Sequence, residues 1–450
     1  MKKETLILIS VLLILGTGVG LVHVLLMPPF QNPDEIQHFL YSASYAYPPK
    51  RMETVEAKVL EELKKTRWFH FVGIGPGWES TRSISEISFV FHFDTDRTSA
   101  TSARKTLFHF LYGNILKLSG IKGVMPAFYF LRLLSMAFFL IILLLVFWFF
   151  KTHYPETWVY YVAGTVLVFQ MLTILNAVNY DVLLVLSGVL FFAAAYRYHQ
   201  NREKKYLAVM LTAALLASLT KLAGVLFFVF LFLLLCLDVK WDLKLMKNFS
   251  LVLIIVVLGF CWMNYLFPGR FFSLYSVIFG VLRDAGASVS AAGGKVFRPG
   301  LFASMIDSFY FQTGWMGFKL SDIWYLVLKL FLLLSLVGVS AAIFVKRLKT
   351  SSLEKKWFVF VLMVILLQVL GIWLYYGGKT AVQGRYLYPV IIPIIMLIYS
   401  GLLKLRELFH LKRDYIVIFY LLFQVVLTVF AVTRIISVFY LEMASPHPGL

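Results

Sequence analysis

Apolar residues recur along this chain in long runs, and each run is separated from the next by a shorter polar or charged segment. Runs of roughly 17–25 apolar residues match the length of helix that crosses the hydrocarbon core of a membrane. The pattern therefore predicts an all-α integral membrane protein with about eleven transmembrane helices. The expected spans are residues 5–27, 126–150, 156–175, 181–198, 206–220, 222–238, 249–267, 323–345, 357–376, 386–403 and 415–438.

Three of these spans depend on the placement of charged residues. The apolar stretch 206–238 is too long for one helix, and Lys221 interrupts it, so we divide it there. The first span follows Lys2 and Lys3 and is longer than the apolar core of a cleaved signal peptide, which has about 7–15 residues. We therefore expect an uncleaved first span.

Composition supports one membrane unit over residues 1–450, because 60% of the residues are hydrophobic and 14% are charged. Soluble domains carry about 25% charged residues. The net charge of +19 could suggest a nucleic-acid partner, but many Lys and Arg residues lie in short loops between spans and form no contiguous basic stripe. This distribution favours contact with anionic membrane lipids and excludes nucleic acid as the expected partner.

The basic loops also predict an orientation. Placing Lys2 and Lys3 in the cytosol puts every other basic short loop on the same side, as the positive-inside rule requires. These cytosolic segments are 202–205, 240–247, 346–356 and 404–413. The outer-face segments are then 28–125, 176–181, residue 221, 268–320 and 377–385. These outer-face segments hold most of the polar residues that are candidates for function.

Two outer loops are long enough to contain structure of their own. In the first loop, 28–125, the spacing predicts a helix over 55–65 and an amphipathic helix over 107–118 that lies in the membrane interface. The second, 268–320, has a glycine-rich tip and an aromatic segment.

The first candidate site is the segment that follows the first span. We expect Asn32 to cap a helix, with Pro33 at its first position and acids in its first turn. Capping does not require His38, one turn after Asp34 on the same face. Asp34 is therefore the candidate general base, Glu35 is a second acid for that role, and His38 is expected to orient the carboxylate.

A second candidate site lies in the outer segment 377–386. Lys379 and Arg385 could anchor a helix end by extending to the interface. Cations on short loops are biased to the cytosolic side, however, and the planar guanidinium of Arg suits bidentate phosphate binding. We favour phosphate binding.

Three further outer positions have two interpretations each. Lys221 is either a functional cation or a helix end that extends to the interface. Asp181 follows Asn179 at the start of a span, where helix capping is the favoured interpretation. Trp315, within the aromatic segment 308–315, belongs either to an interfacial aromatic belt or to a surface that stacks on a sugar ring.

Five motifs, in this order, carry a resemblance that covers most of the chain. They are Pro33-Asp34-Glu35 with His38-Phe39, the Asn179/Asp181 pair, Thr220-Lys221, Gly314-Trp315 and Gln383-Gly384-Arg385-Tyr386. Together they resemble an uncharacterised family of bacterial polytopic membrane proteins that is itself similar to the GT-C glycosyltransferases. The first and last motifs are the most specific.

The resemblance implies a GT-C fold and a sugar donor carried on a polyprenyl phosphate. It makes Asp34 the candidate base and Arg385 a donor-phosphate ligand, with Lys379 and Lys221 matched to the same phosphate. Glu35 and His38 join Asp34 as catalytic candidates because of their positions beside it. Substrate binding falls to Gln383, Tyr386, Asp181 and Trp315. A second acid in the first loop, present in some GT-C groups, has several matches here, which leaves a divalent metal cofactor open. The matches are Glu79, Glu86, Asp94 and Asp96.

The expected reaction moves the sugar to a glycan, lipid or protein acceptor. Asp34 would remove a proton from the acceptor hydroxyl, and a single displacement would invert the anomeric centre. Two other functions remain open. One is a polymerase or ligase of lipid-linked oligosaccharides, and the other is a transporter or flippase of lipid-linked glycans, which would need polar groups near the bilayer midplane.

Overall fold

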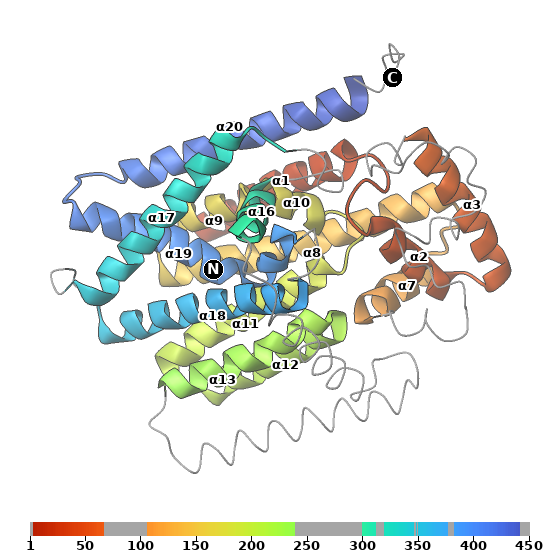
Figure 1. Ribbon diagram of the computed structural model, residues 1–450. Helices are drawn as coiled ribbons and strands as arrows, with labels where there is room; N and C mark the ends of the chain where they lie inside the picture. The colour runs from red at the N-terminus through yellow and green to blue at the C-terminus, as the bar shows by residue number, and fades with distance from the viewer. Residues whose placement is uncertain are drawn as a thin grey trace.

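The structure is a computed structural model, and it confirms the all-α fold class across the residues that it describes (Figure 1). These are residues 3–66, 106–238, 299–311, 319–345, 348, 350–376 and 382–441. Within those ranges the chain forms helices and their connections, with no strand.

Seven helices among the described residues are long and apolar enough to cross a membrane, and a bent pair of helices raises the number to eight. The seven are α1 (Lys3–Leu26), α8 (Val124–His153), α11 (Asp181–Asn201), α17 (Asp322–Phe344), α18 (Ser352–Tyr376), α19 (Ile391–Leu408) together with the 3-10 helix η4 (Gly384–Val390), and α20 (Tyr415–Ile436). After α20 the chain continues as a short π-helical turn, η5 (Ser437–Leu441). An integral membrane protein is therefore supported. The expected span 249–267 lies outside the described residues.

One expected span is a broken helix, and one expected break between spans is confirmed. The segment expected as one span over 156–175 forms α9 (Trp158–Val166) and α10 (Phe169–Leu175), which meet at a bend of 64°. The break expected at Lys221 is confirmed. It separates α12 (Lys204–Thr220) from α13 (Leu226–Asp238), and the 3-10 helix η3 (Leu222–Val225) lies between them.

The described part of the first loop contains three helices, and two of them confirm the expected helical segments. These are α2 (Glu35–Ala46), α3 (Pro49–Lys65), which begins earlier than the expected 55–65, and α7 (Leu107–Ser119). Helices α2 and α7 pack closely because Gly113 lets α7 approach α2. A Cβ at this position would lie 2.4 Å from the carbonyl oxygen of Ser42. In the second loop, α16 (Pro299–Tyr310) is described, while residues 67–105 and 268–298 lie outside the described residues.

The basic segments that the structure describes gather at one end of the helix bundle. The ring of His199 contacts the carbonyl oxygen of Leu353 at 2.9 Å, and Lys404 Nζ lies 3.8 Å from Glu354. These contacts join the last turn of α11, the start of α18 and the last turns of α19. Helices α2, α3 and α7 lie at the other end (Figure 1). The described basic segments and the first loop thus occupy opposite ends, as their expected membrane sides require.

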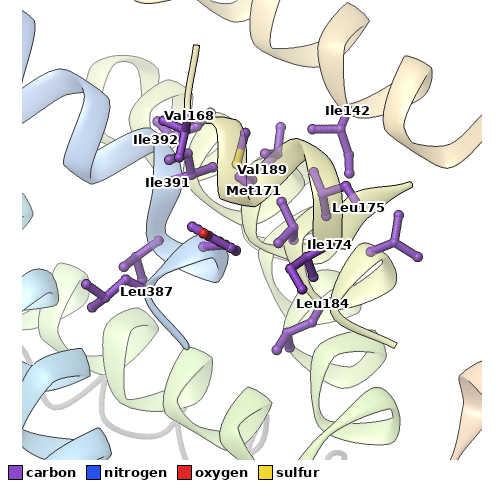
Figure 2. Packing of buried hydrophobic residues seen from close by; sticks show 14 of the residues in the cluster. Ile142, Val168, Met171, Ile174, Leu175, Leu184, Val189, Leu387, Ile391 and Ile392 are labelled. Atoms are coloured by element: carbon purple, nitrogen blue, oxygen red, sulfur yellow. The ribbon is translucent and has the colours of Figure 1, made fainter. Parts of the chain in front are cut away.

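Apolar packing positions the segment around η4. Figure 2 shows Ile391 and Ile392, at the start of α19, beside residues of α10 and α11 such as Met171 and Val189. Leu387 of η4 belongs to the same hydrophobic cluster. The approach to α11 is close at Gly188, where a Cβ would lie 2.0 Å from the carbonyl oxygen of Pro389. Any larger side chain at Gly188 would therefore displace η4.

Candidate functional site

A buried ion pair holds the end of α1 against the start of α2. Glu35 accepts hydrogen bonds from Arg132 Nε and Nη2, both at 2.8 Å, and neither side chain is exposed to solvent. Arg132 also donates to the carbonyl oxygens of Val24, Met27 and Pro28. All five N–H groups of this guanidinium are therefore bonded, as burial of a charge requires.

The same loop is tied to the segment before α11. Glu35 Oε1 accepts a hydrogen bond from the backbone N–H of Val178 at 3.1 Å, and Asn179 Nδ2 donates to the carbonyl oxygen of Pro33 at 3.1 Å. Asn179 Oδ1 accepts from the backbone N–H of Asp181. These bonds bring the start of α11 against Asp34.

Two sequence interpretations change in light of these contacts. The carboxylate of Glu35 is fully buried and bonded to Arg132, so a role as a second base does not fit its surroundings. The capping role favoured for Asp181 is wrong. At this helix start, Asn179 Oδ1 accepts the hydrogen bond of the Asp181 backbone N–H. The carboxylate of Asp181 makes no cap hydrogen bond.

Asp34 precedes α2 in the left-handed conformation, with φ 61° and ψ 4°. The expectation that Asn32 caps this helix and Pro33 begins it is wrong, because the helix begins at Glu35 and its N-cap is Asp34. The Asp34 side chain makes no cap hydrogen bond. Left-handed backbone is uncommon for residues other than glycine, although Asp and Asn tolerate it better than most, and such positions often occur at functional sites.

Four charged side chains from distant parts of the chain meet beside Asp34. Arg385 Nη2 donates to Asp34 Oδ2, and Arg385 Nε lies 3.9 Å from Asp181 Oδ2. Asp181 Oδ1 accepts a hydrogen bond from Lys221 Nζ at 3.0 Å. The structure thus joins Asp34, Arg385, Asp181 and Lys221 in one ion-pair cluster.

The cluster is mostly withdrawn from solvent, with side-chain exposures of 5% for Arg385, 3% for Asp181, 12% for Lys221 and 26% for Asp34. The interpretation of Lys221 as a helix end that extends to the interface is therefore wrong. Its ammonium instead pairs with Asp181 inside the protein. Asp34 is the member of the cluster that solvent reaches most easily.

Two tyrosine rings lie against the cations of the cluster. Lys221 Nζ is 4.4 Å from the ring centroid of Tyr180 and 4.8 Å from that of Tyr386. The guanidinium carbon of Arg385 is 5.4 Å from the Tyr386 ring. These distances allow cation–π attraction, which holds both cations in place without a further carboxylate.

Helix α16 fixes the backbone that carries Arg385. The backbone N–H of Gly384 donates to Ser308 Oγ at 2.7 Å, and a Cβ on Gly384 would lie 2.2 Å from the backbone nitrogen of Phe309. From α18, Gln368 Nε2 donates to the carbonyl oxygen of Tyr386 at 2.7 Å. Gly384 is therefore required for the close approach of η4 to α16.

Of three other residues expected at the site, the structure describes one. Gln383 is the N-cap of η4 and is half-buried beside Arg385 in the sequence. Lys379 and Trp315 lie outside the described residues.

Several polar atoms in the cluster are buried without a hydrogen-bond partner among the described residues. These atoms are Arg385 Nε, Arg385 Nη1 and Asp181 Oδ2. The 3.9 Å separation between Arg385 Nε and Asp181 Oδ2 is too long for a hydrogen bond. Because buried polar groups are usually satisfied, the two guanidinium nitrogens are suited to the oxygens of an anionic ligand.

His38 is bonded to a second histidine and makes no hydrogen bond with Asp34. His38 Nδ1 and His109 Nε2 are 2.9 Å apart, and His109 Nδ1 accepts the backbone N–H of Thr106 at 3.0 Å. Burial, together with the positive charges of Arg385 and Lys221, holds the pKa of His38 well below its usual value. The expected orientation of Asp34 by His38 is therefore wrong, and Arg385 is the residue that binds the carboxylate.

Sequence reasoning missed Arg132, His109 and Tyr180 as parts of this region. Arg132 could have been identified, because a cation inside an apolar span usually has either a buried ion-pair partner or a functional role. His109 and Tyr180 had no signal in the sequence, since their roles depend on contacts with distant residues.

No group of three or more His, Cys, Asp or Glu side chains suited to a metal ion occurs in the described part of the chain. The four candidates for a second acid, Glu79, Glu86, Asp94 and Asp96, lie outside it.

Comparisons with protein-family models, with curated proteins and with solved structures find no match to this chain.

Proposed function

We propose that this chain is a membrane glycosyltransferase of GT-C type that takes a sugar from a polyprenyl-phosphate donor. One observation carries the proposal. The ion-pair cluster joins a solvent-accessible carboxylate, Asp34, to a guanidinium, Arg385, that has two buried nitrogens without partners. A base and a phosphate ligand are the two groups that this reaction requires of the protein.

The donor phosphate would bind at Arg385. Its Nη1 and Nε carry N–H groups that can donate to phosphate oxygens. A bidentate contact would pair one of them with Nη2, which donates to Asp34 in the absence of a ligand. Lys221 adds a second positive charge, linked to Arg385 through Asp181. The polyprenyl tail would lie among the apolar helices that surround this end of the bundle.

Donor binding would also release the base. Without a ligand, Asp34 Oδ2 accepts a hydrogen bond from Arg385 Nη2, so this carboxylate oxygen is already occupied. A phosphate that bonds to Arg385 competes with this contact. The carboxylate of Asp34 then becomes free to accept a proton only when the donor is in place.

The transfer itself is a single displacement. Asp34 takes the proton of the acceptor hydroxyl, and the acceptor oxygen forms a bond to the anomeric carbon of the sugar. The bond between that carbon and the phosphate oxygen breaks, and its electron pair leaves with polyprenyl phosphate. Arg385 and Lys221 stabilise the leaving group, and the anomeric centre is inverted.

We place this site on the outer face of the bacterial cytoplasmic membrane. The support is the separation of charge along the bundle, with the basic loops at one end and the ion-pair cluster toward the other. Under the positive-inside rule the basic end faces the cytosol. The acceptor is a glycan, lipid or protein exposed on the opposite side.

A transporter of lipid-linked glycans is the second candidate, and the bend of 64° between α9 and α10 favours it. Broken helices with polar side chains occur at transporter binding sites. Close to this bend, Thr173 Oγ1 and His23 Nδ1 are 3.2 Å apart and both residues are buried. The charged groups, however, meet in the ion-pair cluster and not at this bend.

The purified protein, supplied in detergent with polyprenyl-phosphate sugars and candidate acceptors, separates these functions. We expect a glycosylated acceptor together with release of polyprenyl phosphate, and no transfer from a nucleotide sugar. The same protein in sealed vesicles should not move the lipid-linked donor between leaflets. Movement between leaflets without transfer would contradict the proposal and support the transporter. A polymer of the lipid-linked unit would identify a polymerase.

A further inference from the structure

A chain of two hydrogen bonds fixes the proton position on His109. The backbone N–H of Thr106 can only donate, and it donates to His109 Nδ1 at 3.0 Å. His109 Nδ1 therefore carries no proton. A neutral imidazole has one protonated nitrogen, so the proton of His109 lies on Nε2.

The same reasoning fixes the proton on His38. His109 Nε2 lies 2.9 Å from His38 Nδ1 and, being protonated, is the donor of that bond. His38 Nδ1 is then the acceptor, and the proton of neutral His38 lies on Nε2. Both nitrogens are committed, because Nδ1 accepts from His109 and Nε2 already holds its proton. His38 can donate a hydrogen bond in this state, but it cannot act as a base.

The Nε2–H group of His38 has no partner in the part of the chain that the structure describes. His38 is 4% exposed, and its Nε2 is buried without a hydrogen bond. Most buried polar groups in proteins are bonded, and an unpaired donor destabilises the fold that contains it. A buried donor of fixed tautomer beside a charged site is suited to a ligand that supplies the missing acceptor.

His38 borders the ion-pair cluster. It lies one turn after Asp34 on α2, and its backbone N–H donates to the carbonyl oxygen of Asp34 at 3.0 Å. Its ring meets the Tyr180 ring edge to face, with centroids 4.2 Å apart, and Lys221 Nζ lies over that same tyrosine. The imidazole is thus on the side of the cluster that holds the cations.

We infer that His38 Nε2–H donates a hydrogen bond to a phosphate oxygen of the lipid-linked donor, and that His109 maintains the tautomer that permits this. The inference rests on the proposed function and adds a neutral donor to the phosphate-binding groups. Anionic oxygens accept stronger hydrogen bonds than neutral ones, and the neighbouring cations attract the phosphate to this side. His38 is then a substrate-binding residue, in place of the catalytic role expected from the sequence.

The test uses the full-length protein with ¹⁵N-labelled histidine in detergent, and a short-chain polyprenyl phosphate as the ligand. The His38→Gln variant identifies the His38 resonances by their absence. We expect a neutral His38 with its proton on Nε2 at neutral pH, and a change in the Nε2 resonance when polyprenyl phosphate is added. A proton on Nδ1 in the free protein would overturn the inference.

Two variants test the donated bond separately from the ring. The His38→Phe variant keeps an aromatic ring against Tyr180 but removes the donor, and we expect its affinity for polyprenyl phosphate to fall about tenfold, the size of one net hydrogen bond. The His38→Gln variant retains an N–H donor and should lose less. If the phenylalanine variant does not fold, the Nε2 resonance of the parent still decides the question.

The remaining outcomes distinguish this inference from the proposed function. Unchanged affinity in His38→Phe, with an unmoved Nε2 resonance in a parent that binds the ligand, would overturn the role of His38 and leave the function intact. A parent protein that does not bind polyprenyl phosphate would overturn both.

Discussion

Arg385 and Asp34 lie 351 positions apart in the sequence, yet the guanidinium of one donates a hydrogen bond to the carboxylate of the other. The pairing depends on supports at both ends. Glu35 and Arg132 fix the loop that carries Asp34, and Ser308 fixes the 3-10 helix that carries Arg385. Both charged side chains are therefore held in position before any substrate arrives.

The first prediction concerns the carboxylate. Asp34→Asn should lower transfer by about 100-fold or more, because an amide cannot accept the proton that a general base removes. The fold should be retained, since asparagine tolerates the left-handed backbone that Asp34 adopts at φ 61°. Turnover and thermal unfolding of the purified variant measure the two effects.

The matched control is Glu35→Gln, which changes the neighbouring acid. Since Glu35 is bonded to Arg132 and fully buried, this variant should unfold more easily but keep turnover per folded molecule close to that of the parent. Normal turnover in Asp34→Asn would show that Asp34 is only a helix-start residue. Selective loss of turnover in Glu35→Gln would move the base to that position.

Arg385→Lys tests phosphate recognition while conserving the charge. The ammonium cannot reproduce the rigid planar contact, and the lost charge-assisted hydrogen bond is worth roughly 1.5–3 kcal/mol, or about a tenfold to hundredfold loss of donor affinity. Binding of a polyprenyl phosphate to the detergent-solubilised variant measures this loss. Equal affinity in parent and variant would place the phosphate elsewhere, with Lys221 the next position to examine.

The buried pair between Arg132 and Glu35 predicts an order of stabilities. Breaking a buried ion pair costs about 3–5 kcal/mol. Arg132→Met should destabilise the protein more than Glu35→Gln, because Arg132 also satisfies the carbonyl oxygens of Val24, Met27 and Pro28. Unfolding midpoints in one detergent measure the order, and the reverse order would show that these backbone contacts contribute little.

Gly188→Ala tests the packing that positions η4. The new Cβ would lie 2.0 Å from the carbonyl oxygen of Pro389, so we expect a loss of stability of about 1–3 kcal/mol together with weaker donor binding at Arg385. Gly18→Ala is the matched control, since a Cβ at this helical position meets no atom within 4 Å. Similar behaviour of the two variants, measured by unfolding and by donor binding, would contradict the account.

The long apolar spans, the break at Lys221 and the helices of the first loop could be predicted from the sequence, because each depends on local periodicity or on a single interrupting charge. The motifs containing Asp34 and Arg385 could also be identified as candidates. The bend between α9 and α10 could not, since it lies within one continuous apolar run and no proline or glycine occurs at the residues that join the two helices, 167 and 168.

The predictions about the site that were wrong have one physical cause. Asp181, Lys221 and His38 each had a reasonable local interpretation, as a cap, as a helix end and as a partner of Asp34. In the structure, Asp181 and Lys221 instead contact each other, although they lie 40 positions apart in the sequence. His38 contacts His109, which lies 71 positions away. Local spacing carries no information about such pairings, which arise only when α2, α7, α11 and α12 pack together.

The buried histidine predicts how stability depends on pH. The pKa of His38 lies below its unfolded value of about 6.5, so the unfolded chain binds a proton that the folded protein excludes. The stability contributed by neutral His38 is therefore fully present above about pH 6.5 and decreases as the pH falls below that value. Unfolding midpoints should decrease less on acidification in His38→Gln than in the parent, and an identical pH dependence would contradict this assignment.

The structure of the protein bound to a polyprenyl phosphate tests the central claim most directly. The account predicts that the phosphate lies within hydrogen-bond distance of Arg385 Nη1 and that the contact between Arg385 and Asp34 is broken, which leaves the carboxylate free to act as a base. A bound phosphate at another place, with the Asp34–Arg385 pair still intact, would contradict the proposed site.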